Sequence, residues 1–153
     1  KLELDIQQYI PLSYMKNISY RVGGGKFTNQ EQQFFVDFSR FTKHNLPVGW
    51  KDEIGGVFQL LDSRWYNASR HYVRGHLTYE SPFLLLRHLI KETRFVLNER
   101  LYLNVLGMKH MNPYLEVGYG IGTHIFDLGL FVSSTNWKQF KFGFEITFEL
   151  FSR

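Results

Sequence analysis

The chain has 153 residues, which fits one domain, and 44% of them are hydrophobic, which excludes a disordered chain. The net charge is +4, but the lysines and arginines are scattered without a basic run, which argues against nucleic-acid binding. The sequence has no cysteine, so disulfides and thiolate metal sites are excluded, and it has no apolar run of about 20 residues for a membrane-spanning helix.

The first predicted elements are two strands in which apolar and polar residues alternate. They cover residues 2–10 and 16–27, and the second contains three consecutive glycines. Period-two alternation over such lengths is typical of half-buried β-strands. Residues 28–56 are less regular, and we interpret them as a strand piece followed by a long loop. A short strand is expected at residues 57–62.

The middle of the chain predicts two longer elements and a connection. Residues 72–80 alternate until Pro82 interrupts them. Residues 83–90 have helical spacing but are few for a stable helix, so we expect a turn or short helix there, at the periplasmic end of a barrel. Residues 94–107 are long enough to span a bilayer, although Glu99 falls on their apolar face.

Three further strands are expected near the C-terminus, at residues 114–122, 126–133 and 140–151. The last is the most regular, because its polar face alternates with an unbroken apolar face. We predict that this apolar face contacts lipid through Phe140, Phe142, Phe144, Ile146, Phe148 and Leu150.

These elements predict an all-β fold, an antiparallel up-and-down transmembrane β-barrel of about eight strands. Strands of about 9–11 residues span a bilayer when tilted, and barrels also collect aromatic residues, which make up 18% of this chain. Residues 1–153 are interpreted as one outer-membrane barrel domain, the C-terminal part of a larger barrel. A complete small barrel and a soluble β-sandwich, whose strands also have one apolar face, are the alternatives.

A family resemblance rests on several stretches. They are Gly25-Lys26-Phe27, Phe35-Val36-Asp37-Phe38, Phe58-Gln59-Leu60-Leu61-Asp62 and the most specific one, Pro113-Tyr114-Leu115-Glu116-Val117-Gly118-Tyr119-Gly120-Ile121. Through them the chain resembles the C-terminal barrel of a Bacteroidota outer-membrane family of unknown function. The resemblance implies an N-terminal carboxypeptidase-regulatory-like domain and a barrel distantly similar to the BamA/surface-antigen superfamily. The family has no established catalytic residues.

Two glycine patterns invite a nucleotide-binding interpretation that their spacing does not support. Residues 23–26 lack the spacing and the Ser or Thr of a phosphate-binding loop. Gly118, Gly120 and Gly122 alternate on one strand face, and we expect them to form a smooth lumenal patch against which a loop packs.

Five charged residues are candidates for a lumenal network that holds a plug. They are Arg94, Arg100, Glu116, Glu145 and Glu149. A pair of these carboxylates would be needed for acid–base chemistry, which is the enzymatic alternative. The histidines are dispersed, so we expect no metal site, and no cofactor is expected.

The sequence therefore predicts a non-enzymatic integral protein of the bacterial outer membrane with a structural, transport or envelope-assembly role. A lipid-modifying enzyme and a soluble binding module are the alternatives. The expected partners are outer-membrane lipid, the barrel-assembly machinery, which reads an aromatic last strand, and an upstream domain or further strands of the same protein. No nucleic acid is expected.

Overall fold

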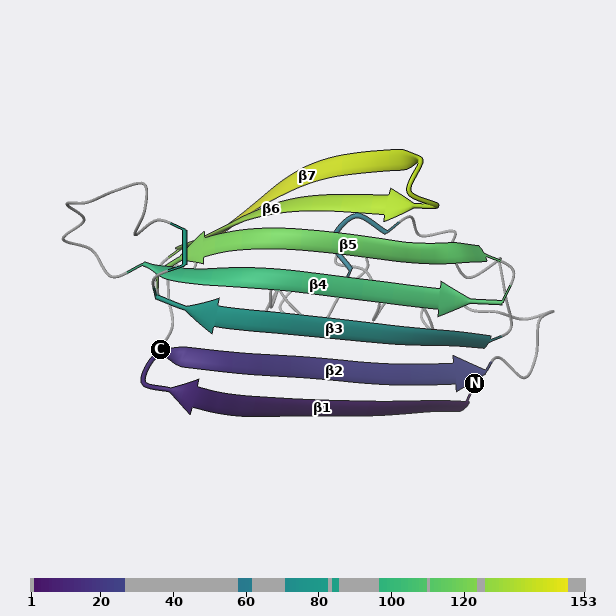
Figure 1. Ribbon diagram of the computed structural model, residues 1–153, viewed down its shortest axis with the longest axis horizontal. Helices are drawn as coiled ribbons and strands as arrows, with labels where there is room; N and C mark the ends of the chain where they lie inside the picture. Colours follow the sequence, from purple (N-terminus) through teal and green to yellow (C-terminus); the bar gives the residue numbers. More distant parts are fainter. Residues whose placement is uncertain are drawn as a thin grey trace.

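The computed structural model describes residues 2–26, 58–61, 71–82, 84–85, 97–109, 111–123 and 126–148. These residues form one antiparallel sheet in which every strand pairs with the next one in the sequence (Figure 1). The seven described strands are β1 (Leu2–Ser13), β2 (Lys16–Lys26), β3 (His71–Ser81), β4 (Asn98–Met108), β5 (Met111–Gly122), β6 (Phe126–Thr135) and β7 (Gln139–Phe148). The predicted all-β, antiparallel, up-and-down architecture is confirmed.

The strands follow the predicted alternation, but several boundaries differ from the expected ones. The strand expected at residues 94–107 begins only at Asn98, and the one expected at 114–122 begins earlier, at Met111. The last strand is described as far as Phe148. Hydrogen-bonding partners across the sheet, which periodicity does not report, set these limits.

Three other expectations concern the connections. Residues 58–61 contain a single bridge residue, Phe58, followed by a bend, so the short strand expected at 57–62 is wrong in this part. Of residues 83–90, only 84 and 85 are described, and they form a bend. The loop expected at 28–56 lies outside the described residues.

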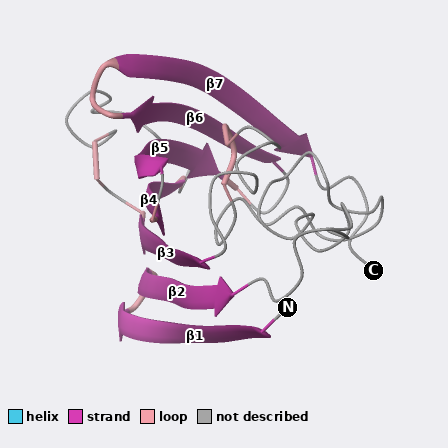
Figure 2. Ribbon diagram, turned by 90° about the vertical axis from the view of Figure 1, so that its right-hand side faces the viewer, coloured by secondary structure: helices cyan, strands magenta, loops and turns pink. Residues whose placement is uncertain are grey.

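The described sheet is open. Within the described residues, β1 and β7 each pair on one side only, so the sheet is not closed, and its seven strands are close to the expected eight. Figure 2 shows that the sheet is curved, with β1 and β7 bent toward the same side. The curvature gives the sheet a concave and a convex face.

The two faces differ sharply in chemistry. Register partners share a face, and the concave face carries Arg74, His76, Asn104 and Glu116, all of them buried. The convex face carries apolar side chains that are exposed: Leu4, Ile6, Val73, Leu101, Leu103, Val117, Leu130, Phe142 and Phe144. The buried apolar core lies on the concave side and consists of Phe58, Leu61, Tyr72, Leu106 and Tyr114, with Met108 packed against it.

Aromatic rings cover several glycines of the concave face. A Cβ at Gly118 would overlap the ring of Phe131, and one at Gly120 would lie 2.9 Å from the ring of Tyr102. The ring centroids of Tyr102 and Phe131 are 5.5 Å apart. The expectation that these glycines form a smooth patch for a loop is therefore corrected, because side chains of the neighbouring strands occupy the space above them.

Candidate functional site

A row of polar side chains crosses the concave face through three neighbouring strands. His76 of β3 is in register with Asn104 of β4, and Asn104 is in register with Glu116 of β5. Nδ1 of His76 lies 3.0 Å from Oδ1 of Asn104, and Nδ2 of Asn104 donates to Oε1 of Glu116 at 2.8 Å. Antiparallel register brings these three residues together from separate parts of the sequence.

Glu116 holds a piece of the β2–β3 connection against the sheet. Its carboxylate accepts the backbone N–H groups of Gln59 at 3.0 Å and of Leu60 at 2.8 Å. The hydroxyl of Tyr114 donates to the same carboxylate at 2.9 Å. Hydrogen bonds to an ionised acceptor are stronger than neutral ones, so Glu116 anchors residues 58–61 on the concave side.

Packing supplements this anchor at both ends of the segment. The ring of Phe58 lies 4.6 Å from the ring of His76 and 5.6 Å, edge-on, from that of Tyr114. Leu60 reaches across to β7, where its side chain occupies the space that a Cβ at Gly143 would take. Residues 58–61 therefore cross the concave face from β3 to β7.

A second buried carboxylate, Glu99, anchors the β3–β4 connection. It accepts the N–H groups of Leu84 and Leu85, each at 2.7 Å, and the hydroxyl of Tyr119 at 2.5 Å. These contacts explain a charged residue on the otherwise apolar convex face. In the sequence, Glu99 interrupts the apolar face of residues 94–107. This interruption was the sequence feature that pointed to a specific role for its carboxylate.

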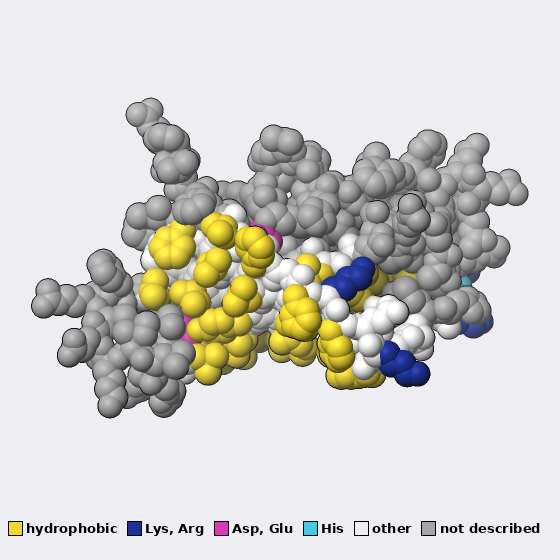
Figure 3. Space-filling model, turned by 90° about the horizontal axis from the view of Figure 1, so that it is seen from above, with side chains coloured by type: hydrophobic (Ala, Val, Ile, Leu, Met, Phe, Trp, Pro, Cys, Tyr) yellow, Lys and Arg dark blue, Asp and Glu magenta, His cyan; other side chains and the backbone are white. Residues whose placement is uncertain are grey.

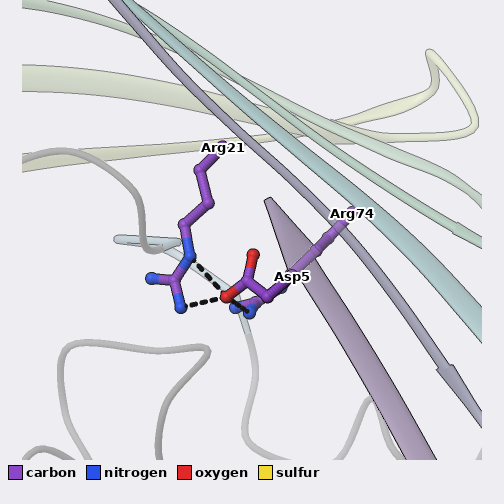
Figure 4. A network of polar contacts seen from close by, with 3 residues as sticks. All are labelled: Asp5, Arg21 and Arg74. Atoms are coloured by element: carbon purple, nitrogen blue, oxygen red, sulfur yellow. Dashed lines mark hydrogen bonds and ion pairs between the residues drawn. The ribbon is translucent and has the colours of Figure 1, made fainter. Parts of the chain in front are cut away.

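Asp5 joins the first three strands through two arginines (Figure 4). Its Oδ2 atom accepts from Nε of Arg21 at 2.8 Å and from Nη2 of Arg74 at 2.7 Å. Gly23 lies between Asp5 and Arg74 in register, and a Cβ there would be 2.9 Å from Nε of Arg74. A glycine at this position therefore leaves room for the ion pair.

Of the five predicted charged residues the structure describes Arg100, Glu116 and Glu145, and it places the two carboxylates apart. Arg100 forms ion pairs with Asp127 at 2.7 Å and with Glu80 at 3.4 Å. Glu145 is in register with Gly129 and so with Gly120, four residues along β5 from Glu116. This offset is about 13 Å along a strand, too far for a carboxylate pair. Arg94 and Glu149 lie outside the described residues.

The predicted lipid-contacting face of the last strand is exposed where its side chains are described. Phe142 and Phe144 are 77% and 76% exposed, and Phe140 and Ile146 are exposed as well. Figure 3 shows a broad gathering of hydrophobic side chains on this side of the molecule. The side chain of Phe148 and all of Leu150 lie outside the described part.

The described residues offer little for metal chemistry. Among them, no group of three or more His, Asp or Glu is arranged to hold a metal ion. Glu99 and Glu116 instead accept hydrogen bonds from backbone groups and tyrosines, and Glu116 also accepts one from Asn104, an arrangement that fixes connections to the sheet.

No helix in the described ranges has the length and hydropathy needed to cross a membrane.

Comparison with known protein families identifies a domain over most of the chain. Residues 1–121 match the C-terminal domain of a family of unknown function (DUF5686). No curated protein matches the chain significantly, and no solved structure does so either.

Proposed function

Since the chain belongs to the DUF5686 family of unknown function, as its C-terminal domain, we propose that it is a non-enzymatic, integral β-barrel segment of the bacterial outer membrane. Its role would be structural, in transport or in envelope assembly. One observation carries the proposal: the sheet exposes its apolar face and buries its charged face.

A soluble protein has the opposite distribution, because burial of apolar surface drives its folding. Here Arg74 is 1% exposed and Glu116 is fully buried, whereas Phe142 and Phe144 keep about three quarters of their surface accessible. A contiguous apolar patch that extends over seven described strands exceeds what soluble monomers expose. If lipid contacts the convex face, the exposed apolar side chains are no longer in water, and their exposure is explained.

The dimensions of the apolar band support a bilayer. Exposed apolar rows extend from Ile146, in register with Glu99, to Val73, in register with Gly107, and Phe126 and Leu2 lie one row further at the two ends. From Glu99 to Gly107 a strand rises about 26 Å, or about 20 Å across a bilayer at a tilt of about 40°. The lipid-facing band of outer-membrane barrels is about 25 Å tall.

The resemblance to a Bacteroidota outer-membrane family, distantly similar to the BamA/surface-antigen superfamily, supports the same location. The partners in this proposal are outer-membrane lipid and, during insertion, the barrel-assembly machinery. The hydrogen-bonded His76–Asn104 pair lies on the concave side beneath the ring of Phe58. This position separates the pair from lipid and favours a structural role over lipid-modifying catalysis.

The connections orient the sheet in the proposed membrane. Outer-membrane barrels have short periplasmic turns and longer extracellular loops. At one end the β1–β2 turn at Tyr14 and Met15 is short and the β3–β4 connection covers residues 82–97, whereas the longest connection, between β2 and β3, lies at the opposite end and covers residues 27–70. We therefore place the Tyr14 turn in the periplasm and the β6–β7 turn, with Trp137, outside the cell.

Cysteine labelling tests the proposal, because the chain has no cysteine of its own. Tyr14 and Trp137 are 90% and 75% exposed and lie at opposite ends of the strands, so Tyr14→Cys and Trp137→Cys form a matched pair. In intact cells a membrane-impermeant maleimide should label Trp137→Cys, and Tyr14→Cys only after the outer membrane is permeabilised.

One outcome would contradict this proposal, and another would change only the orientation. Recovery of the protein in the soluble fraction without detergent, with both cysteines equally reactive, would show that the convex face does not contact lipid. Labelling of Tyr14→Cys but not Trp137→Cys in intact cells would leave the membrane location in place and reverse the orientation.

A further inference from the structure

A short piece of the β3–β4 connection lies on the convex side of the sheet. Glu99 of β4 points to this side, as does Leu101 two residues along the strand, but Leu101 is exposed whereas Glu99 is fully buried. The carboxylate of Glu99 accepts the N–H groups of residues 84 and 85, each at 2.7 Å. In Figure 2 a short loop segment lies outside the curve of the sheet, beside β4 and β5. The connection therefore turns toward the side on which the proposed function places lipid.

We propose that Leu84 and Leu85 form a lipid-binding loop, which enters one leaflet at the boundary between headgroups and acyl chains and is held there by Glu99. This inference rests on the proposed membrane function and deepens it, because it assigns an interaction surface outside the strands. The leaflet is the one at the end of the Tyr14 turn, which is the periplasmic leaflet in the orientation proposed above.

The depth of Glu99 in the proposed bilayer agrees with such a boundary position. Leu103 lies in the middle of the exposed apolar rows, and Glu99 lies four residues before it on β4. Four residues of a strand rise about 13 Å, or about 10 Å along the bilayer normal at a tilt of about 40°. The lipid-facing band of a barrel is about 25 Å tall, so its border lies about 12 Å from the middle. The carboxylate of Glu99 is therefore close to the border of the hydrocarbon, where interfacial segments lie.

Hydrogen bonding explains how a loop is tolerated at this depth. An unpaired backbone N–H group is costly in hydrocarbon, so irregular backbone is avoided on lipid-facing surfaces. Glu99 removes this cost for two consecutive N–H groups, and the hydroxyl of Tyr119 donates to the same carboxylate at 2.5 Å. These donors in turn offset the desolvation of the carboxylate. A charged residue on the apolar face is thus the device that allows the loop to lie there.

The side chains of the loop match the neighbouring surface. Leu85 is exposed and Leu84 is half-buried. Oε2 of Glu99 accepts both from the N–H group of Leu85 and from the hydroxyl of Tyr119, so Leu85 adjoins this tyrosine. Tyrosine is enriched at membrane interfaces, where its ring meets acyl chains and its hydroxyl meets a polar group. The loop therefore continues the apolar surface toward the headgroups and does not cover it with polar side chains.

Depth-dependent fluorescence quenching tests the inference on the complete natural protein, reconstituted into vesicles of phosphatidylethanolamine and phosphatidylglycerol. This chain has no cysteine, and serine replaces any cysteine elsewhere in the polypeptide. A nitrobenzoxadiazole label is attached at Leu85→Cys. Matched labels at Phe142→Cys, near the middle of the apolar band, and at Tyr14→Cys, in the turn, report the acyl-chain centre and water. The quenchers are iodide on both sides of the vesicle membrane and lipids that carry a nitroxide either near the headgroup or at mid-chain.

The expected result is that nitroxide near the headgroup quenches the Leu85→Cys label most strongly, and that iodide quenches it several-fold less than the Tyr14→Cys label. The Phe142→Cys label should respond most to mid-chain nitroxide. If that response is present, strong iodide quenching at Leu85→Cys would place the loop in water, and the absence of any quenching would place it under protein. Either result would overturn the inference alone, whereas loss of the Phe142→Cys response would contradict the proposed membrane function as well.

The anchoring role of Glu99 is tested in the same labelled protein. Glu99→Gln presents an amide donor to the N–H groups of the loop, so iodide quenching of the Leu85→Cys label should rise several-fold. Glu99→Asp keeps the charge on a shorter side chain, should give a smaller rise, and serves if Glu99→Gln does not assemble. Glu80→Gln, which alters a carboxylate on the concave face, is the control and should leave the quenching unchanged. Unchanged quenching in the Glu99 variants would overturn the anchoring by Glu99.

Discussion

At the scale of single residues, small side chains on the concave face make room for large ones. Gly23 leaves space for the ion pair of Asp5 and Arg74, and Gly118 lies under the ring of Phe131. Glycine weakens a strand when nothing uses the space above it. Here a neighbouring side chain occupies that space, so these glycines contribute to packing.

We predict that Gly118→Ala lowers the free energy of unfolding by about 1–3 kcal/mol, because the added methyl group overlaps the ring of Phe131 and overpacks the interior. Gly75→Ala, on the convex face, is the matched control, since a Cβ at this position would meet no heavy atom of another residue within 4 Å. Urea titration of the protein in lipid vesicles measures both.

Replacing Phe131 by a smaller side chain tests whether the clash with its ring causes the loss. In the double variant Gly118→Ala/Phe131→Leu the loss should be smaller than the sum of the two single losses, because the clash is relieved. Equal effects of Gly118→Ala and Gly75→Ala, or strict additivity in the double variant, would contradict the packing account.

At the scale of elements, two buried carboxylates fasten connections to the sheet in the same manner. Glu116 binds consecutive N–H groups of residues 59 and 60 on the concave face, and Glu99 binds those of residues 84 and 85 on the convex face. Each also accepts a tyrosine hydroxyl. Consecutive backbone donors need an acceptor with several lone pairs, which a carboxylate provides.

We predict that Glu116→Gln releases residues 58–61 and lowers the free energy of unfolding by about 3 kcal/mol, because the amide loses the charge and presents a donor to other buried donors. Hydrogen exchange at the amides of Gln59 and Leu60 should accelerate. Glu80→Gln is the control, as its ion pair with Arg100 is longer and partly exposed and should contribute little. Unchanged exchange in Glu116→Gln would contradict the anchoring role.

At the scale of the whole molecule, the exposed apolar face decides between a membrane and a soluble protein. On the convex side every strand from β1 to β7 carries exposed apolar side chains (Figure 3 shows part of this surface). In water, molecules with such an apolar surface associate with one another. In a bilayer, lipid chains solvate the same surface.

We predict that Phe142→Arg, near the middle of the apolar band, destabilises the protein in a bilayer by about 2–4 kcal/mol, because lipid does not solvate a charge at that depth. At an exposed site of a soluble protein the same change would be nearly neutral. Gln139→Arg, on the opposite face of β7 beside the turn, is the control and should have little effect. Refolding titrations in vesicles give both values, and a neutral Phe142→Arg would contradict lipid contact.

Much of the fold follows from alternation alone. Four strands lie at nearly the expected places, those predicted at residues 2–10, 16–27, 72–80 and 126–133. Each has one apolar and one polar face, and this alternation identifies a strand from local sequence. The location of the last strand and its apolar face was also predictable. Its lipid contact stays a prediction.

The candidate site was less accessible from the sequence. Glu116 was identified as a charged residue on the polar face, but its partners at residues 59 and 60 come from a connection whose path no periodicity describes. The proximity of His76 and Asn104 depends on the register between β3 and β4, two strands joined by a long connection. Alternation assigned Glu116 and Glu145 to the same face but not to positions along their strands. The register places them about 13 Å apart along the strands, so they do not form a pair.

The sequence by itself determined an all-β chain with one apolar and one polar face on each strand, because side chains alternate with a period of two wherever the strand pairs. Only the tertiary structure decided which face is covered. The concave side buries Arg74, His76 and Glu116, the last two in contact with residues 58–61, and the apolar convex side is left exposed. The reason is that curvature, register and the path of a long connection arise from contacts between distant residues, which local alternation does not encode.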